Sequence, residues 1–360
     1  MRAGRIVSAV SACLLGGVLV SWGSDALAQA DLVGAARREG RVVVYGSLET
    51  DVFEVIQKIF EGKYGVRVEY WRAASNRVTD RVLTEARAGR PQFDVVLTNR
   101  SPMLIMKRAG VFGKYTAPSY EAFPVASHDP DGILSPSYRV VVVSILLNTR
   151  LLRPDDAPKS LAELLDPRWK GRVVMPDPTL HTTTAVWLSN LQKVLGPQHR
   201  AFVERIAGQV GLVESFIPSA QKVIAGEFPL GISHVKYVHV FGQDGAPLDY
   251  VRLNPVLAEA HHVALGAKPD HPNAGKLFID LLTSRLGLLA LARAGEFVLV
   301  PGVYPPIRDA DKLRIVMMDD LDDAELRKFR AASATRRWVS PDGSPWPTMR
   351  RPTAIRTPTG

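Results

Sequence analysis

The 360-residue chain contains a single cysteine, Cys13, which lies inside an apolar stretch near the N-terminus. Removal of that stretch would leave no thiol, and this would exclude both structural disulfides and thiolate chemistry. The catalytic motifs G-x-S-x-G and H-E-x-x-H are absent. A four-residue S-x-x-K pattern at Ser219–Lys222 lacks the companion S-D-N and K-T-G motifs of serine-acylating enzymes. We therefore interpret Ser219 as a helix cap and expect no enzymatic activity.

Long apolar runs are also scarce, and the one that resembles a targeting sequence extends from Ile6 to Trp22. Two arginines precede it and the small-residue pattern Ala26-Leu27-Ala28 follows, which is the order of a secretory signal peptide. We predict a signal peptide over residues 1–28, cleaved after Ala28, and a periplasmic location. A transmembrane anchor is the first alternative, but the run is short and has no basic flank after it. A lipoprotein modified at Cys13 is the second, but the run continues well beyond that residue.

Excess charge of one sign is confined to the ends of the chain. The formal net charge is +9, yet residues 326–360 carry eight Lys or Arg and one Asp, and residues 1–28 carry two Arg and one Asp. The remainder is close to neutral, which argues against a nucleic-acid-binding surface. The tail is rich in Pro, Arg and Thr and ends in RRPTAIRTPTG, so we expect it to be solvated and partly disordered.

The central sequence alternates short β-branched runs with helical patterns. RVVVYGS, VRVEYW and FDVVLT are typical of strands, and the segments between them carry apolar residues at helical spacing. A second region continues with RVVVVSILLNT, RVVMPDP, GEFPLGIS and LDYVRL as strands, and NAGKLFIDLLTSRLGLLALARAG as a long helical segment. This order predicts an α/β fold of mainly parallel sheets with helices on their faces.

Open parallel sheets bind ligands at the carboxyl ends of their strands, where loops lead into helices. Here these loops are rich in hydroxyl groups and carry several cations. In the stretch GISHVKYVHVF, the histidines, lysine and tyrosine follow such a strand. The candidate ligand-binding residues are Ser47, Glu49, Arg72, Ser75, Asn76, Thr98, Asn99, His181, Thr182, Thr183, Thr184, Ser233, His234, Lys236 and Tyr237. Some of these residues also have a purely structural interpretation, because Thr182 to Thr184 can serve only as a helix cap.

Several stretches resemble a known family in the family's order. They are VVVYGSLETDVFEVIQKIFEGKYGVRVEY, ARAGRPQFDVVLT, SLAELLDPRWKGRVVMPDP, GEFPLGIS and KPDHPNAGKLFIDLLTSRLGLLALARAGEFVLVPGV, which cover most of residues 41–307. The chain resembles bacterial extracellular solute-binding proteins of ABC importers, in the ferric-iron, phosphonate and sugar-phosphate branch of the type II periplasmic-binding fold. The C-terminal tail lies outside the resemblance.

The resemblance implies two α/β lobes with a hinged cleft between them. We expect lobe 1 to comprise residues 29–140 and 267–317, and lobe 2 to comprise residues 141–266. The crossings are expected near Arg139–Leu147 and Glu259–Lys268, where His261 and His262 would serve core or hinge packing. Residues 318–360 would form a C-terminal segment that packs on lobe 2 and ends in the basic tail.

The resemblance also implies where iron would bind. In ferric-binding members of the family, the metal is held by a tyrosine pair after the strand that corresponds to PLGIS, and a histidine and a carboxylate in other loops assist. Here the pair aligns with Lys236-Tyr237, the histidine with Glu49 and the carboxylate with Asn99. A lysine has the wrong charge for Fe(III), whereas hard oxygen ligands suit it. We therefore expect a small anion (a phosphonate, a phosphate ester or an organic carboxylate) and no metal or other cofactor. Iron held by Glu49 and Tyr237 remains the alternative.

The resemblance also implies partners. They are a small-molecule solute and the membrane permease subunits of an ABC importer with a cytoplasmic ATPase, and we expect a monomer and no nucleic acid. A ligand-sensing subunit that docks on a receptor kinase is a second alternative, because closed lobes would signal the bound state to either partner.

Overall fold

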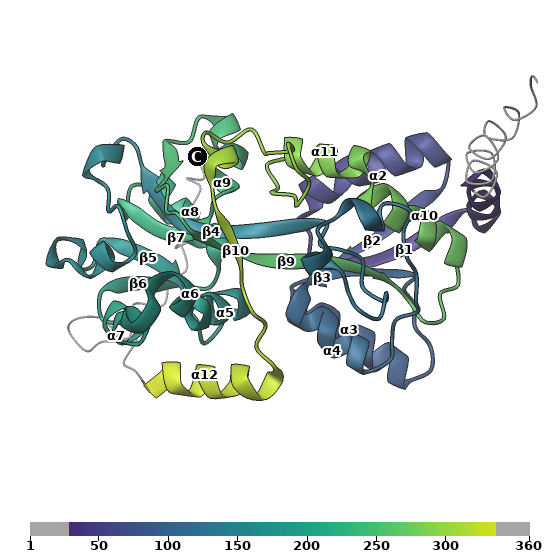
Figure 1. The fold of residues 1–360 in the computed structure, drawn as a ribbon, viewed down its shortest axis with the longest axis horizontal. Coiled ribbons are helices and arrows are strands. Elements are labelled where there is room, and N and C mark those ends of the chain that lie inside the picture. The colour runs from purple at the N-terminus through teal and green to yellow at the C-terminus, as the bar shows by residue number, and fades with distance from the viewer. Residues whose placement is uncertain (1–28, 336–360) are drawn as a thin grey trace, which may run out of the picture.

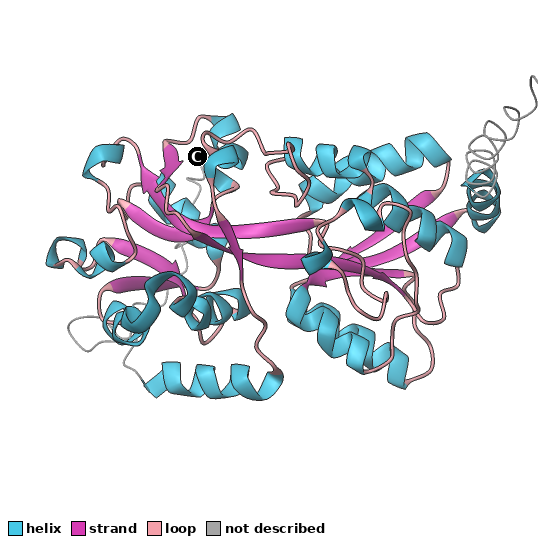
Figure 2. Cartoon of the chain, viewed as in Figure 1, coloured by secondary structure: helices cyan, strands magenta, loops and turns pink. Residues whose placement is uncertain are grey.

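The computed structural model describes residues 29–335, and all its strands belong to one mixed sheet. The order along the sheet is β2-β1-β3-β9-β4-β7-β5-β6, with β10 paired to β9 and β8 paired to β4 (Figures 1 and 2). The strands are β1 (Arg41–Gly46), β2 (Arg67–Arg72), β3 (Val95–Asn99), β4 (Arg139–Asn148), β5 (Val173–Pro176), β6 (Val210–Val213), β7 (Leu230–His234), β8 (Leu248–Tyr250), β9 (Val256–Leu265) and β10 (Ile315–Met317).

Helices cover both faces of this sheet, as the predicted β-α alternation requires (Figure 2). The described part of the chain begins with a helix over residues 29–39. The later helices are α2 (Thr50–Tyr64), α3 (Ser75–Arg87), α4 (Arg100–Arg108), α5 (Thr182–Asn190), α6 (Gln192–Leu195), α7 (His199–Ile206), α8 (Phe216–Ile224), α9 (Tyr237–Val240), α10 (Pro272–Thr283), α11 (Arg285–Arg293) and α12 (Asp323–Thr335). No helix of the described residues is both long and apolar enough to cross a membrane.

Two long strands, β4 and β9, run through the middle of the molecule and join its two halves (Figure 1). Residues 139–143 of β4 pair with β9, and residues 143–147 pair with β7. In the same way β9 pairs with β4 over residues 257–261 and with β3 over residues 261–265. We call the half that contains β1–β3, α2–α4, α10 and α11 lobe 1, and the half that contains β5–β8 and α5–α9 lobe 2. The two strands overlap the segments 139–147 and 259–268, in which the resemblance led us to expect the crossings.

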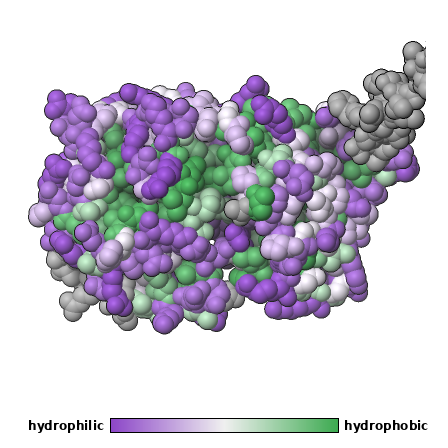
Figure 3. Space-filling model, in the orientation of Figure 1, coloured by the Kyte–Doolittle hydropathy of each residue, from purple (hydrophilic) through white to green (hydrophobic). Residues whose placement is uncertain are grey.

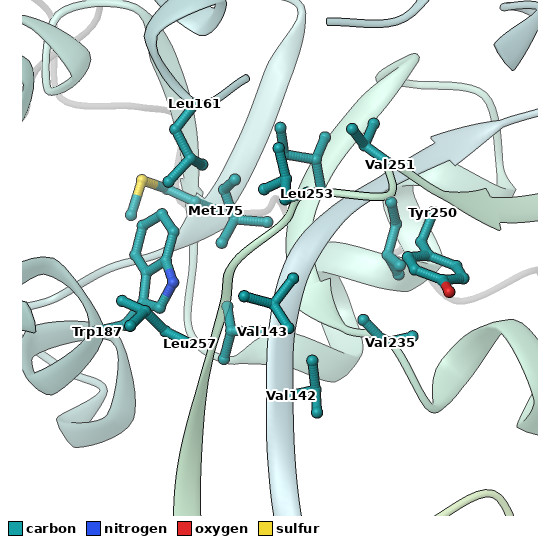
Figure 4. Packing of buried hydrophobic residues seen from close by; sticks show 14 of the residues in the cluster. Val142, Val143, Leu161, Met175, Trp187, Val235, Tyr250, Val251, Leu253 and Leu257 are labelled. Atoms are coloured by element: carbon teal, nitrogen blue, oxygen red, sulfur yellow. The ribbon is translucent and has the colours of Figure 1, made fainter. Parts of the chain in front are cut away.

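The apolar core is divided in the same way. One cluster of buried side chains lies in lobe 2, and two clusters lie on the opposite faces of the lobe 1 sheet. Figure 4 shows the lobe 2 cluster, in which Trp187, Met175 and Leu161 pack beside Val143 and Leu257 from the crossing strands. Both crossing strands are buried along all ten residues, so each contributes to the core that it passes through. Apolar side chains also show at the surface in Figure 3, over the region of β7, β4 and β10.

Local sequence signals account for most element boundaries. Gly65 has φ 68°, and its N–H donates to Glu61 O, so it ends α2 in the left-handed conformation that glycine adopts at no cost. The single long helix expected over residues 273–295 is instead two helices. Ser284 is extended between α10 and α11, and its hydroxyl accepts a hydrogen bond from Gly287 N, so it caps the second helix. Ser219, interpreted as a cap, lies inside α8 and donates to Ile232 O at 2.9 Å.

The C-terminal part of the chain differs from the expected lobe division. Helices α10 and α11 pack in lobe 1, but Ile307, Ala310 and Met318 belong to the lobe 2 core. Strand β10 pairs in parallel with residues 256–258 of β9, the end of that strand that lies in lobe 2. The chain after α11 thus returns to lobe 2 before residue 317. The predicted signal peptide, residues 1–28, and the end of the basic tail, residues 336–360, lie outside the described residues.

Gly46, the last residue of β1, provides a test of the packing between β1 and β3. A Cβ atom at this position would lie 2.7 Å from Leu97 Cδ1 and 2.8 Å from the Leu97 carbonyl oxygen. Gly46→Ala is therefore expected to lower the free energy of unfolding by about 1–3 kcal/mol. Gly62→Ala is the control, because a Cβ there meets nothing within 4 Å, and alanine is favoured inside a helix by about 0.5–1 kcal/mol. Urea unfolding of both variants measures the difference. Equal stability of the two variants would contradict the close approach.

Candidate functional site

A cleft of about 750 Å³ lies between the two lobes. Its lining comes from the loops after β1, β2, β3, β5, β6 and β7, from the start of β4 and the middle of β9, and from the C-terminal segment. The carboxyl ends of the strands thus meet at this cleft, as the rule for open α/β sheets requires. Two smaller cavities, of about 420 and 380 Å³, are lined by lobe 1 residues alone.

Most of the predicted ligand-binding residues line this cleft. They are Ser47, Glu49, Arg72, Ser75, Asn76, Asn99, His181, Thr182, Thr183, His234 and Tyr237. These residues are up to 190 positions apart in sequence, and only the folding of the two lobes brings them together.

Four predicted residues do not line it, because their side chains are directed into the protein. Thr98, Thr184 and Ser233 are fully buried, and Lys236 is 4% exposed. Thr98 bonds to Ser47 Oγ at 2.7 Å, and Ser233 donates to Phe216 O at 2.8 Å. Thr184 lies 3.4 Å from His181 Nδ1. These residues support the cleft wall from behind.

Lys236 belongs to a buried cluster of four charges. Its Nζ lies 2.8 Å from Glu49 Oε1 and 2.8 Å from Glu296 Oε1. Arg139 Nη1 lies 3.0 Å from Glu49 Oε2 and 2.6 Å from Glu296 Oε1. Two cations and two anions thus neutralise one another. The expectation that Lys236 supplies free positive charge to an anion is not what this geometry shows, because both glutamates already neutralise it.

The same cluster also occupies Glu49, which the alternative hypothesis assigns as an iron ligand. Burial opposes ionisation of Glu49, but Lys236 and Arg139 outweigh it and hold the pKa of its carboxyl well below the usual range. Each of its oxygens already contacts a cation. Tyr237 lines the cleft, and burial together with Glu49 and Glu296 raises the pKa of its hydroxyl well above the ordinary value. Among residues 29–335, no group of three or more His, Cys, Asp or Glu side chains is placed to hold a metal ion.

A row of four rings forms the lobe 2 wall of the cleft. His181 packs edge-on against Phe216 at 4.8 Å between ring centroids, His234 lies 4.1 Å from Phe216, and Tyr237 stacks on His234 at 5.5 Å. Burial lowers the pKa of His234 well below its ordinary value, and Lys236 adds to the shift. Burial and then Arg330 lower the pKa of His181 to about 4. Both imidazoles are therefore neutral at pH 7. Neither ring nitrogen of His234 has a hydrogen-bond partner in the described part of the chain.

Glu259, on the crossing strand β9, was not predicted as a site residue. It lines the cleft, accepts Asn99 Nδ2 at 2.8 Å and accepts Thr183 Oγ1 at 2.7 Å. It therefore bonds lobe 1 through Asn99 and lobe 2 through Thr183. Burial raises the pKa of its carboxyl, although both hydrogen bonds oppose the shift.

Other lining residues were also missed, among them Arg139, Glu214, His261 and Arg330. A signal for two of them exists in the sequence. Arg139 begins the apolar run RVVVVSILLN, and the histidine is one of three ionisable residues inside VLAEAHHVAL. An ionisable residue inside a buried strand requires a polar partner or access to water. Here Arg139 has the two glutamates of the charge cluster, and His261 lines the cleft. Arg330 gave no signal, because the C-terminal segment was expected to pack on lobe 2 and no pattern in the sequence directs one of its residues to the cleft.

Three helix N-termini open into the cleft, and their N-cap residues make no side-chain cap. In the first turn of α3, Arg77 N–H donates to the side-chain oxygen of Asn76 at 2.9 Å. The N-cap residues are Ala74 for α3, His181 for α5 and Ser215 for α8, and none of them makes a side-chain capping bond. The first residues of the same helices line the cleft: Ser75 and Asn76, Thr182 and Thr183, and Phe216. The first N–H groups of a helix have no partner within the helix and carry the positive end of its dipole.

Comparison with known proteins gives a consistent result. Residues 41–295 match the model of a family described as bacterial extracellular solute-binding protein. An uncharacterized protein of Haemophilus influenzae is 25% identical over 317 residues, which are 82% of this chain and 90% of that protein.

Two solved structures share the fold over nearly their whole length. The periplasmic binding protein AfuA from Actinobacillus pleuropneumoniae, with fructose-6-phosphate bound, matches with a TM-score of 0.66 and 22% identity over 83% of this chain and 96% of its own. A substrate binding protein of an ABC transporter from Agrobacterium tumefaciens matches with a TM-score of 0.72 and 15% identity over 82% of this chain and 94% of its own. The predicted periplasmic-binding fold is confirmed.

The buried charge cluster leads to a first prediction for this site. Glu296→Gln removes one of its two anions and leaves an uncompensated buried cation, since Arg139 and Lys236 then share Glu49 alone. Breaking a buried ion pair in this way is expected to cost about 3–5 kcal/mol in the free energy of unfolding. Glu54→Gln is the control, because its pair with Lys58 is exposed and worth less than about 1 kcal/mol. Chemical denaturation measures both losses, and comparable losses would argue against the cluster.

A second prediction concerns the dependence of stability on pH. Burial lowers the pKa of His262 to about 4, and its Nδ1 lies 2.7 Å from Ser135 O. In the unfolded chain its pKa is about 6.5, so between pH 6.5 and pH 4 the unfolded state binds the additional proton and stability falls as the pH falls. His262→Asn keeps a nitrogen donor but does not titrate.

The stability advantage of the wild type over His262→Asn should therefore be full at pH 7.5 and smaller at pH 5 by about 2 kcal/mol. Urea unfolding at the two pH values measures it. The other buried histidines are present in both proteins, so their contributions cancel in the difference. A difference that does not change with pH would show that His262 has the same pKa in the folded and the unfolded protein.

Proposed function

Because this chain belongs to the family of bacterial extracellular solute-binding proteins, we propose that it captures a small anionic solute between its lobes for an ABC importer. The family is one of binding proteins rather than enzymes, in agreement with the absence of catalytic motifs. The partners would be the permease subunits and their ATPase. Periplasmic location after cleavage at Ala28 is part of the proposal.

The observation that carries the anionic class is the set of uncapped helix N-termini. The N-terminus of α3 belongs to lobe 1, and those of α5 and α8 belong to lobe 2. An anion between them would accept N–H groups from both lobes, and each helix would add the positive end of its dipole. A ligand that contacts both lobes binds the closed state better than the open one, and this difference drives closure.

The charge cluster bears on the anionic class differently from the sequence-based expectation, in which Lys236 itself attracts the anion. Since Glu49 and Glu296 neutralise Lys236 and Arg139, they remove the net charge from the floor of the cleft. The free donors are then the helix N-termini and those arginine side chains of the lining that form no ion pair within residues 29–335, of which Arg72 is one.

The remaining polar lining fits a solute that also carries hydroxyl groups. Ser47, Asn76 and Thr183 can both donate and accept hydrogen bonds, and Asp80 and Glu214 can accept from hydroxyls. Among phosphonates, phosphate esters and organic carboxylates, a phosphate ester of a polyol or a hydroxy acid uses the most of these groups. AfuA, which shares the fold at 22% identity, has a sugar phosphate bound, and this molecule is therefore a suitable first probe.

Solute binding can be measured on protein from which bound ligand has been removed by unfolding and refolding. The panel comprises fructose 6-phosphate, 2-aminoethylphosphonate, citrate, ferric citrate and thiamin. A ligand at one hundred times its Kd should stabilise the protein by about 2.7 kcal/mol, which a thermal-shift assay detects. We expect a shift with one of the organic anions. Iron alone, with a tyrosinate absorption band, would support the alternative with Tyr237 as ligand, and a response to thiamin alone would contradict the anionic class.

Arg72 provides the variant for the same assay. Arg72→Gln removes a cation from the cleft lining and is expected to weaken binding of the anion about tenfold. Arg77→Gln is the matched control, because Arg77, in the first turn of α3, is exposed and does not line the cleft. Calorimetric titration of both variants measures the loss. Equal Kd values for the two variants would remove Arg72 from the site.

A further inference from the structure

The segment after β10 spans the mouth of the cleft and bonds both lobes through two adjacent residues. Asp319 pairs with lobe 2, where its N–H donates to Asn190 Oδ1 at 2.7 Å and its carboxylate lies 2.6 Å from Lys193 Nζ. Asp320 pairs with lobe 1, where its carboxylate lies 3.0 Å from Arg100 Nε and accepts Ser101 Oγ at 2.9 Å. The expectation that this segment packs on lobe 2 therefore describes only part of its contacts.

Helix α12 follows directly and brings one of its faces to the cleft. In Figure 1 it lies below α5, with its first turn nearest to α3 and α4. Leu326 and Arg330, four residues apart and hence on one face, both line the cleft, and so does Leu321 ahead of the helix. The segment therefore forms part of the cleft wall. It lies beyond residues 41–295, the part of the chain that matches the family model.

Arg330 is the one cation that this helix directs into the cleft. Its Nη2 donates to Thr182 Oγ1 at 2.8 Å, at the uncapped start of α5. Its Nε is buried and has no hydrogen-bond partner, and no ion pair with a carboxylate occurs in the described chain. The guanidinium is also close enough to His181 to contribute to the lowered pKa of that imidazole.

This arrangement places like charges together. The guanidinium lies beside the positive end of the α5 dipole, and Arg330 forms no ion pair within residues 29–335. The carboxylate at this helix start, Glu259, already accepts Thr183 Oγ1 and Asn99 Nδ2. A buried donor without a partner costs free energy, and so does a cation near a helix N-terminus. An anion bound at the start of α5 would satisfy the free guanidinium N–H and relieve the repulsion, and a planar guanidinium suits phosphate or carboxylate oxygens.

We propose that Arg330 is a solute-binding residue whose guanidinium, together with the N-terminus of α5, binds the anionic group of the solute. The proposal rests on the anionic class inferred above. It assigns part of the specificity of the cleft to a C-terminal segment outside the matched family region. The bonds of Asp319 and Asp320 hold that segment at the mouth of the cleft, so they act as positioning residues for Arg330.

The test compares Arg330→Gln with Arg327→Gln in the full chain. Both variants remove one positive charge from α12, but Arg327 is exposed and does not line the cleft. The probes are fructose 6-phosphate, 2-aminoethylphosphonate, citrate and inorganic phosphate, with Kd measured by calorimetric titration at low and high salt. We expect Arg330→Gln to raise the Kd of the bound anion about tenfold to a hundredfold, and Arg327→Gln to change it by less than about twofold.

Two further readouts separate contact with the solute from support of the fold. A direct ion contact makes the Kd depend on salt, so this dependence should be weaker in Arg330→Gln than in Arg327→Gln, whereas a residue that only holds α12 in place would leave it unchanged. Arg330→Lys keeps the charge but loses the planar fork, and it should lose less affinity than Arg330→Gln. If the glutamine variant does not fold, the lysine variant replaces it in the comparison. The guanidinium contact would then be contradicted if Arg330→Lys binds the anion as tightly as the wild type does and with the same salt dependence.

The outcomes are distinct. If the wild type binds an anion and Arg330→Gln binds it as tightly as Arg327→Gln does, the proposal for Arg330 is wrong and the proposed function stands. If the wild type binds none of the anions but responds to ferric citrate or thiamin, the proposed function fails, and the proposal for Arg330 fails with it. A selective loss in Arg330→Gln supports both.

Discussion

The buried cluster of Arg139, Lys236, Glu49 and Glu296 is the interaction on which the cleft depends. Its members come from the start of the first crossing strand, from the loop ahead of α9 in lobe 2, from the start of α2 in lobe 1, and from the loop after α11. Charges that are withdrawn from water are tolerated only with close partners of opposite sign. The cluster therefore requires the four segments to meet at one point, and this point is the floor of the cleft.

Neutral charge at the floor has a consequence for ligand recognition. With both cations neutralised by glutamates, the electrostatic potential of the cleft is set by groups that have no partner of their own. These are the three uncapped helix N-termini and the free arginine side chains around them. Backbone N–H groups are held rigidly by their helices, so they give a fixed arrangement of donors. Flexible side chains then distinguish one anion from another.

The crossing strands explain how such a site can open and close. Strands β4 and β9 each pair with different neighbours along their length, so the two lobes share one sheet without sharing a core. Glu259 lies in the middle of this crossing and bonds Asn99 in lobe 1 and Thr183 in lobe 2. The C-terminal segment makes a second link through Asp319 and Asp320. Relative motion of the lobes would change both links, so both contribute to the balance between the open and closed states.

Much of the architecture could be predicted from local patterns. The runs RVVVYG, RVEYWR and VVLTN form the strands that their β-branched residues indicated. The positions of the binding loops also followed, because the carboxyl ends of parallel strands meet at one edge. Eleven of the predicted residues line the cleft for this reason.

The sequence by itself thus determined the α/β order and the loops that form the cleft, because both depend on short-range periodicity and on chain connectivity, whereas the crossings were expected only from the resemblance to a family. Only the tertiary structure decided the role of individual charges. Lys236 follows the right strand, yet it lies beside Glu49 and Glu296, which are 187 residues before it and 60 residues after it. Arg330 lies beyond every recognisable pattern and reaches Thr182 across 148 residues. Electrostatic partners are set by distance in space, which local sequence does not encode.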